Sequence, residues 1–446
     1  MTLKQARAPI GLYVHFPFCV SICPYCDFVV YGGRAARGPA SQVERMVAAL
    51  IAEIRIRAPN SSGLPLATVY LGGGTPSLMT AQHVERLLAE IDAGFGIVAA
   101  AEVTIEVNPG PDERGDLRGL RAAGVNRVSI GAQSLDPAEL RRLGRRHSPS
   151  DVAATVAEAR RAGFDNISLD LLYDIPGQTL DSWRRTLGDT LALAPEHVSA
   201  YSLALDDPDS DGLTGTLGDH LPLRPGPQRW RNRALIEQDA DRAADCYELA
   251  DDFLSAAGLG WYEISNWARP GRQSRHNQIY WSGAAWDAVG PGAHAFDGAF
   301  TRRWNAAPLD AYLSALVPAD GSSPALPPGS SEIVGAAVAR AESVVLALRT
   351  RAGVSRAVAN RAEHAAAFSW AATNGLLVST ADDRVRLSPR GRLLSNELFA
   401  RLMPDTGSAF HSEGEQGLPT PFATPPVVDS KPAFGYDAGI SLALRQ

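Results

Sequence analysis

The sequence predicts an α/β fold: a partial (β/α)6 barrel followed by a small winged-helix-like domain. From residue 11 to about residue 205, short β-rich runs alternate with Ala-, Leu- and Arg-rich stretches of helical period, and parallel strands need such crossover helices. Polar or glycine-rich clusters follow nearly every strand, which is typical of a barrel, whereas an open sheet concentrates its ligand at one switch point. Near the end of the chain, two helical stretches precede two short β-rich runs.

The barrel elements are expected in strict alternation. The strands are predicted at 12–16, 68–71, 102–107, 127–130, 166–171 and 197–203, from their β-branched and aromatic content. The helices between them are predicted at 42–57, 81–91, 112–122, 150–161 and 180–191.

The remainder of the chain divides by composition. A Pro-, Gly- and Asp-rich stretch at 206–231 indicates a surface insertion. A helix at about 238–257 and an aromatic segment at 261–267 then complete the barrel, which is expected to span 11–305 after a short extension at 1–10.

The C-terminal part is expected to begin with a linker at 306–330. The winged-helix-like domain is placed at 331–403, with helices at 332–349 and 355–374 and strands at 376–380 and 385–388. The tail at 404–446 contains six prolines and little periodic apolar pattern, so we expect most of it to be disordered.

The composition favours a cytoplasmic protein whose ligands are small molecules. The 446 residues are 45% hydrophobic and 20% charged, with a formal net charge of −7, which provides no basic field for nucleic acid or an anionic membrane. No apolar run reaches the ~18–20 residues of a membrane span, and residues 1–9 lack the apolar core of a signal peptide. We expect no nucleic-acid partner, and membrane association only at the periphery, through another protein.

Three cysteines follow the first strand in the pattern Cys19-x3-Cys23-x2-Cys26. Three thiolates on one loop can bind three irons of a [4Fe–4S] cluster and leave the fourth iron open. On spacing alone a zinc site stays open as an alternative, with His15 or Asp27 as the fourth ligand. Structural zinc sites usually use a second cysteine pair, and the one remaining cysteine of the chain is isolated.

The cysteine loop and seven later motifs resemble one family. Residues 12–28 read LYVHFPFCVSICPYCDF, and further motifs are GGGTPS at 72–77, EVNP at 106–109, SIGAQS at 129–134, LGRRH at 143–147, DLLY at 170–173 and HNQIYW at 276–281. Together with GPGAH at 290–294, they resemble the radical SAM (S-adenosylmethionine) family of oxygen-independent coproporphyrinogen III oxidase-like proteins, over about 11–402.

This resemblance implies a [4Fe–4S] cluster on the three cysteines and SAM on its open iron. The SAM-contacting positions that it implies are Tyr13, Tyr25, Gly73, Gly74, Thr75, Glu106, Gln133, Arg145 and Asp170. The residue types suit the ligand, because carboxylates can bind ribose hydroxyls and an ammonium group, and a guanidinium can bind a carboxylate.

Two further residues decide between branches of the family. The oxidases carry a fourth cysteine two positions beyond the third, where this chain has Phe28, as in the HemW branch of heme chaperones. His276, in the HNQIYW motif, is a candidate heme ligand beside aromatic rings, and His294 and His15 compete for that role.

Three functions follow from these observations. The main expectation is a heme chaperone that binds heme and transfers it to apo-hemoproteins. The first alternative is an oxygen-independent coproporphyrinogen III oxidase, which decarboxylates its substrate with SAM. The second is a DNA-binding winged-helix protein with a structural metal site, because residues 331–402 contain ten arginines against six acidic residues.

Overall fold

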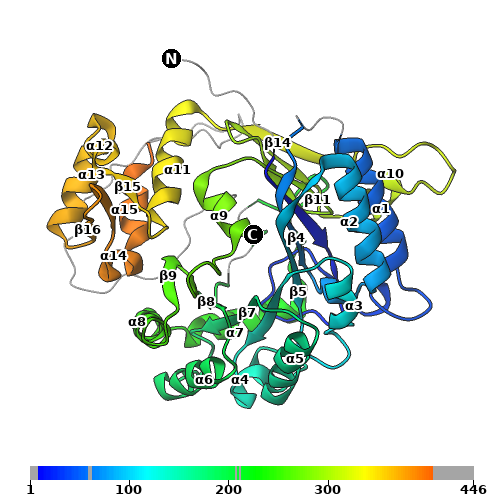
Figure 1. Cartoon of the computed structure of the whole chain (residues 1–446), viewed down its shortest axis with the longest axis horizontal. Helices are drawn as coiled ribbons and strands as arrows, with labels where there is room; N and C mark the ends of the chain where they lie inside the picture. The colour runs from blue at the N-terminus through cyan, green and yellow to red at the C-terminus, as the bar shows by residue number, and fades with distance from the viewer. Residues whose placement is uncertain (1–8, 59–62, 206–207, 210–211, 405–446) are drawn as a thin grey trace.

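The computed structural model describes residues 9–58, 63–205, 208–209 and 212–404. The predicted tail therefore lies outside the described residues, except for Pro404, and so does most of the N-terminal extension. At the centre is a sheet in the strand order β14-β13-β12-β11-β1-β4-β5-β6-β7-β8-β10-β9 (Figure 1). No helix among the described residues is long and apolar enough to cross a membrane.

Seven consecutive strands of this sheet run parallel, and they confirm the predicted α/β fold. In sheet order they are β11 (Trp286–Val289), β1 (Gly11–Phe16), β4 (Leu66–Gly73), β5 (Ile97–Val107), β6 (Arg127–Gln133), β7 (Ile167–Tyr173) and β8 (His197–Ser202). All six predicted strands are present among them. Because the strands are parallel, their carboxyl ends lie at one edge of the sheet.

Helices follow the strands and cover one face of the sheet. They are α1 (Val43–Arg57), α2 (Ala81–Phe95), α3 (Leu117–Ala122), α4 (Pro137–Arg142), α5 (Pro149–Arg161) and α6 (Leu180–Ala192). Thr80, Ser148 and Thr179 begin three of these helices with capping boxes, which satisfy the free N–H groups of the first turn.

Side chains alternate along each strand between two environments. In β6, Val128, Ile130 and Ala132 pack into the main hydrophobic core beneath the helices. Arg127 and Ser129 project from the opposite face of the same strand. We call this opposite, polar face of the parallel strands the lumen face.

Antiparallel strands extend the sheet at both ends. On the β8 side they are β10 (Asn266–Ala268) and β9 (Gly260–Glu263), and on the β11 side β12 (His294–Phe296), β13 (Thr301–Asn305) and β14 (Gly329–Ile333). A separate parallel pair, β2 (Phe18–Cys19) and β3 (Tyr31–Gly32), brackets the cysteine loop.

Four further helices differ in part from the expected pattern. They are α7 (Pro225–Glu237), α8 (Ala240–Ala256), α9 (Arg275–Ser282) and α10 (Leu309–Leu316). Helix α7 begins inside the stretch expected as a surface insertion. Helix α10 lies in the stretch expected as a linker, and it buries Leu309, Tyr312 and Leu313 in the main core.

The C-terminal module has its own core. It consists of α11 (Ala336–Leu348), β15 (Val354–Ser355), α12 (Arg356–Ala359), α13 (Ala362–Thr373), β16 (Leu377–Ser379), β17 (Arg384–Leu387), α14 (Pro389–Leu393) and α15 (Ser395–Leu402). Its three strands form one sheet, and Leu348, Phe368 and Phe399 are among its buried residues. Residues 332–333, expected in a helix, instead belong to β14 of the main sheet.

Candidate functional site

The cysteine loop leaves the carboxyl end of β1 and returns as β3. Cys19 is buried, Cys23 and Cys26 are partly exposed, and all three are free thiols. Burial raises the pKa of Cys19 to about 12 and that of Cys26 well above its ordinary value. The thiols of Cys19 and Cys26 are therefore protonated at neutral pH, and a bound iron ion would have to displace their protons.

The geometry of this loop does not suit the zinc alternative. Within the described ranges, no group of three or more His, Cys, Asp or Glu side chains could hold a metal ion. The two ring nitrogens of His15 are already engaged, Nδ1 with the Tyr13 hydroxyl at 2.9 Å and Nε2 with the carbonyl of Val29 at 2.8 Å. In a [4Fe–4S] cluster each thiolate binds its own iron, so its sulfurs need not converge on one point.

A chain of hydrogen bonds connects two of the cysteines across three strand ends. The Thr75 hydroxyl donates to the Cys19 sulfur at 3.4 Å, and the Asn108 amide donates to the Thr75 hydroxyl at 2.9 Å. Arg145 Nη2 donates to Asn108 Oδ1 at 2.7 Å, while its Nη1 lies 3.7 Å from the Cys23 sulfur. Sequence reasoning did not single out Asn108, which was visible only as part of the EVNP motif.

The side chain of Arg145 retains one unused donor. Its Nε is buried and has no hydrogen-bond partner among the residues that the structure describes. An unsatisfied buried donor is costly, and a guanidinium beside the cysteine loop suits a ligand carboxylate.

The glycine run forms a close contact between the end of β4 and the cysteine loop. Gly73 has φ +107, and a Cβ there would lie 2.5 Å from the ring of His15. A Cβ on Gly74 would lie 2.7 Å from the carbonyl oxygen of Phe18. Only glycine allows this approach, which leaves backbone groups close to the loop.

Two carboxylates lie on the lumen face near the same strand ends. Glu106 accepts hydrogen bonds from the Tyr70 hydroxyl and the Gly73 N–H, both at 2.9 Å. Burial raises the pKa of Glu106 to about 7. Asp170 accepts hydrogen bonds from the hydroxyls of Ser129, Ser168 and Ser199 at 2.7–3.1 Å.

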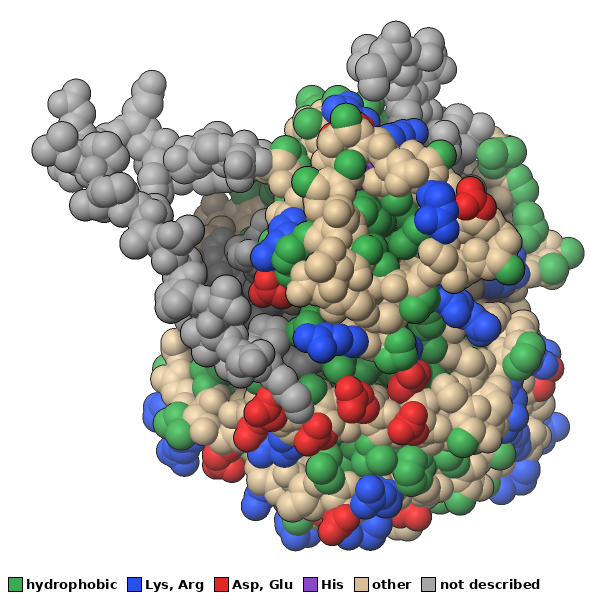
Figure 2. Space-filling model, turned by 90° about the vertical axis from the view of Figure 1, so that its left-hand side faces the viewer, with side chains coloured by type: hydrophobic (Ala, Val, Ile, Leu, Met, Phe, Trp, Pro, Cys, Tyr) green, Lys and Arg blue, Asp and Glu red, His purple; other side chains and the backbone are tan. Residues whose placement is uncertain are grey.

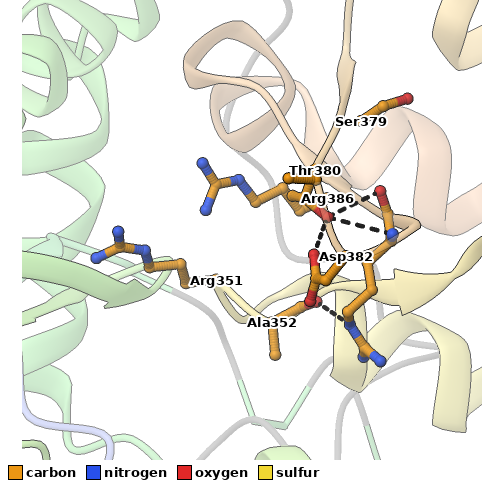
Figure 3. Close-up of a pocket in the computed structure, with 8 residues that line it drawn as sticks. Arg351, Ala352, Ser379, Thr380, Asp382 and Arg386 are labelled. Atoms are coloured by element: carbon orange, nitrogen blue, oxygen red, sulfur yellow. Dashed lines mark hydrogen bonds between the residues drawn. The ribbon is translucent and has the colours of Figure 1, made fainter.

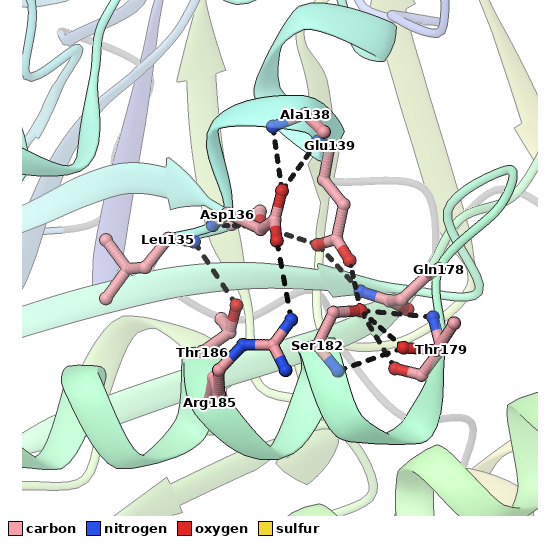
Figure 4. A network of polar contacts seen from close by, with 10 residues as sticks. Leu135, Asp136, Ala138, Glu139, Gln178, Thr179, Ser182, Arg185 and Thr186 are labelled. Atoms are coloured by element: carbon pink, nitrogen blue, oxygen red, sulfur yellow. Dashed lines mark hydrogen bonds and ion pairs between the residues drawn. The ribbon is translucent and has the colours of Figure 1, made fainter.

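Gln133 ends β6 in an uncommon backbone conformation, with φ +62. The network in Figure 4 holds the residues that follow it. The buried carboxylate of Glu139 accepts from the hydroxyls of Ser134 and Ser182, both at 2.6 Å, and from the Gln178 amide at 3.1 Å. This polar network fixes the strand end that carries Gln133.

Helix α7 holds the cysteine loop from outside. Arg231 is buried and donates to the carbonyls of Pro24 at 3.3 Å and Tyr25 at 2.8 Å. The rings of Tyr25 and Trp230 lie 6.5 Å apart. Sequence reasoning missed both α7 residues, because the stretch before them is rich in proline and glycine.

The structure places His276 inside the barrel rather than in an open ligand position. The ring is 1% exposed, with Nδ1 at 2.7 Å from the Thr68 hydroxyl and Nε2 at 2.8 Å from the Tyr280 hydroxyl. It stacks on Tyr70, with ring centroids 5.2 Å apart. Neither ring nitrogen is free in this arrangement.

His294, the competing candidate, is also engaged. Its Nε2 lies 2.8 Å from a carboxylate oxygen of Asp219, and its ring stacks on Trp304 at 5.9 Å.

The C-terminal module carries an open pocket of about 720 Å³ (Figure 3). The residues that line it are Arg351, Ala352, Ser379, Thr380, Ala381, Asp382, Arg384 and Arg386. None of them belongs to the predicted cluster, SAM or heme set. Figure 2 views the molecule from the side of this module and shows basic side chains scattered among acidic ones, so no continuous basic face for DNA is visible there.

Comparison with known proteins gives a consistent result. Residues 13–189 match the radical SAM superfamily. The heme chaperone HemW of Mycobacterium tuberculosis (strain H37Rv) is 38% identical over 395 residues, which cover 89% of this chain and 95% of that protein. The heme chaperone HemW of Bacillus subtilis is 32% identical over 405 residues, covering 88% and 98%.

A solved structure supports the fold. Coproporphyrinogen III oxidase (HemN) from Escherichia coli, described as a radical SAM enzyme, has a TM-score of 0.71 and 23% identity, with 89% of this chain and 90% of that one covered. At this identity the likeness shows the fold alone.

Proposed function

Because this chain belongs to the HemW family of radical SAM proteins, we propose that it is a heme chaperone, which binds heme and transfers it to apo-hemoproteins in the cytoplasm. The relatives that support this are named as heme chaperones and match nearly the whole chain.

The family implies a [4Fe–4S] cluster and SAM, and the residues present fit both groups. Cys19, Cys23 and Cys26 lie on one short loop at the edge where the parallel strands end, and three thiolates leave one iron open. When bound, the two groups supply one-electron chemistry at the sulfonium of SAM. The buried, unpartnered Nε of Arg145 beside this loop is the donor that would receive the SAM carboxylate.

The other proposed SAM contacts surround this loop. They are Tyr13, Tyr25, Gly73, Gly74, Thr75, Glu106, Gln133 and Asp170, and all lie on or just after β1, β4, β5, β6, β7 or the cysteine loop. Glu106 and Asp170 supply negative charge toward the cationic ligand.

The observation that favours the chaperone over the oxidase is Phe28. Its side chain is 50% exposed directly after the cysteine loop. A phenyl ring offers apolar surface but no thiolate, so it cannot replace the fourth cysteine that the resemblance implies for the oxidases.

We do not assign the axial ligand of the heme to His276 in the present arrangement. For its imidazole to bind iron, the hydrogen bond to Thr68 or to Tyr280 would first have to break.

The test is anaerobic reconstitution followed by two parallel assays on the same preparation. Heme addition should give a Soret shift with saturable binding, while coproporphyrinogen III with SAM and a reductant should give no decarboxylated product. A Cys19→Ala variant, which removes one cluster ligand, serves as the cluster-deficient control. SAM-dependent decarboxylation by the parent protein would contradict the chaperone assignment.

A further inference from the structure

The lumen face of the barrel is polar along strands β6, β7 and β8. Three of its strands alternate polar inward residues with apolar core residues: β6 carries Arg127 and Ser129, β7 carries Ser168 and Asp170, and β8 carries His197, Ser199 and Tyr201. A closed barrel packed only for stability would fill these positions with apolar side chains. The lumen face is therefore built for polar contacts.

Arg127 on this face has a donor without a hydrogen-bond partner among the described residues. Arg127 is 2% exposed, and its Nε is buried without a hydrogen-bond partner among the described residues. A buried guanidinium with an unused donor is costly unless a ligand or water supplies an acceptor.

The nearby carboxylates are occupied by other donors. Glu102 accepts from the backbone N–H groups of Arg275 and His276, both at 3.0 Å, at the first turn of α9. Asp170 accepts from three serine hydroxyls, and Glu106 accepts from Tyr70 and Gly73. Glu106 and Asp170 are also the carboxylates proposed here for SAM, which is itself a cation.

Arg127 stays charged, whereas the imidazoles around it are neutral. Burial acts to lower the pKa of Arg127, but the fields of Glu102 and of the Tyr70 hydroxyl raise it above its ordinary value. Burial, and then the charge of Arg127, lower the pKa of His276 to about 3 and that of His197 well below its ordinary value. The lumen face thus presents a fixed positive charge beside neutral rings.

We propose that Arg127 anchors a propionate carboxylate of the bound tetrapyrrole inside the barrel. A planar guanidinium can form two parallel hydrogen bonds with a carboxylate, and such pairs are strong when water is excluded. The aromatic side chains of Tyr70 and Tyr280, next to His276, provide flat surfaces of the kind that pack on a macrocycle. Tyr201, on the lumen face near the carboxyl end of β8, is 38% exposed, so solvent reaches that end of the face.

This inference rests on the proposed function, because it takes the ligand to be heme. The two can be tested separately with heme and heme dimethyl ester, in which both propionates are blocked. Binding of each is followed by Soret titration of the anaerobically reconstituted protein. The parent protein should bind heme about tenfold or more tightly than the ester, the ratio expected for a charge-assisted hydrogen bond.

Arg127→Met should weaken heme binding about tenfold and leave ester binding unchanged, so that the preference disappears. Arg302→Met is the matched control, because Arg302 is largely buried but pairs with Glu332 and Glu342 outside the lumen; it should keep the preference. If Arg127→Met does not fold, Arg127→Gln, which hydrogen-bonds without a charge, gives the same comparison.

Several results would overturn the inference. If folded Arg127→Met or Arg127→Gln keeps the preference for heme, or if the parent binds heme and ester equally, Arg127 does not bind a propionate. If Arg127→Met instead binds SAM more weakly while the ratio of heme affinity to ester affinity is unchanged, Arg127 binds the carboxylate of SAM and not a propionate. If the parent binds neither porphyrin, the proposed function itself is wrong, and this inference fails with it.

Discussion

Single residues set the charge of the proposed SAM region. Glu106 is held by the Tyr70 hydroxyl and the Gly73 N–H, yet burial raises its pKa to about 7 from an ordinary value of 4.5. Near neutral pH this carboxyl is therefore part protonated, and its negative charge predominates only above that pKa. A cationic ligand should sense the difference.

We predict that SAM affinity rises several-fold between pH 6 and pH 8, as Glu106 loses its proton near the pKa of about 7. Equilibrium binding across this range should show the rise in the parent and a flatter, weaker profile in Glu106→Gln. Glu90→Gln, which changes a carboxylate paired with Arg55 away from the site, should behave like the parent. A parent profile without pH dependence would contradict the role of Glu106.

The same shift has a consequence for stability with the opposite sign. The folded chain holds this proton more tightly than the unfolded chain, since the folded pKa is the higher one. Between about pH 4.5 and 7 the contribution of Glu106 to the free energy of unfolding therefore falls as pH rises.

At the scale of elements, α7 is the outer support of the cysteine loop. Arg231 donates to two loop carbonyls, and Trp230 lies beside Tyr25. No cysteine ligand lies on α7, so its effect on a cluster would be exerted entirely through the shape of the loop.

We predict that Arg231→Ala lowers the iron and sulfide content after reconstitution and speeds cluster loss to a chelator severalfold, because two loop carbonyls lose their donor. Arg233→Ala, at an exposed position of the same helix, is the control and should leave both quantities unchanged. Equal cluster retention in the two variants would show that α7 does not support the loop.

Elements with a regular hydrophobic period could be predicted from the sequence, and those that depend on distant partners could not. The six parallel strands that were predicted combine an apolar face with β-branched or aromatic residues. Helix α7 was missed because its sequence begins Pro-Gly-Pro, although proline is tolerated in the first turn, where its missing N–H has no helical partner. Strand β14 reads GSSEI and exists only because it pairs with β13.

The candidate site was predictable to a similar degree. The motifs place the cysteines and proposed SAM contacts at strand ends, and the topology brings those ends to one edge. The partners of His276 were not predictable, because Thr68 is 208 residues away in the chain. A signal for the polar lumen was present: alternate polar residues in β6, β7 and β8, where strands buried on both faces are usually apolar throughout.

At the scale of the whole molecule, Arg392 is one of several arginines that join the C-terminal module to the barrel. Arg392 on α14 is buried, pairs with Asp251 on α8, and lies over the rings of Trp261 at 4.5 Å and Tyr247 at 5.5 Å. Removing Arg392 is costly because it leaves the partly buried Asp251 with the Trp267 N–H as its remaining donor, and because the guanidinium also packs on two rings.

We predict that Arg392→Ala lowers the free energy of unfolding by about 3–5 kcal/mol and increases hydrogen exchange in α11 and α15 more than in β5 and β6. Arg356→Ala, which removes an exposed pair with Asp383, should cost less than about 1 kcal/mol. Chemical denaturation and exchange mass spectrometry measure the two effects. Comparable losses in both variants would contradict a joining role for Arg392.

The support of the cysteine loop by α7 also has a consequence for biosynthesis. Arg231 lies 206 residues after the Tyr25 carbonyl that it binds, so on the ribosome the loop emerges long before its support. At ~5–20 residues per second, this delay is roughly 10–40 s. During that interval the three thiols are on a nascent chain whose loop still lacks the hydrogen bonds from Arg231. Iron delivered then would meet a loop that has not reached its final conformation. Cluster insertion should therefore occur only after α7 has been synthesised and has folded against the loop.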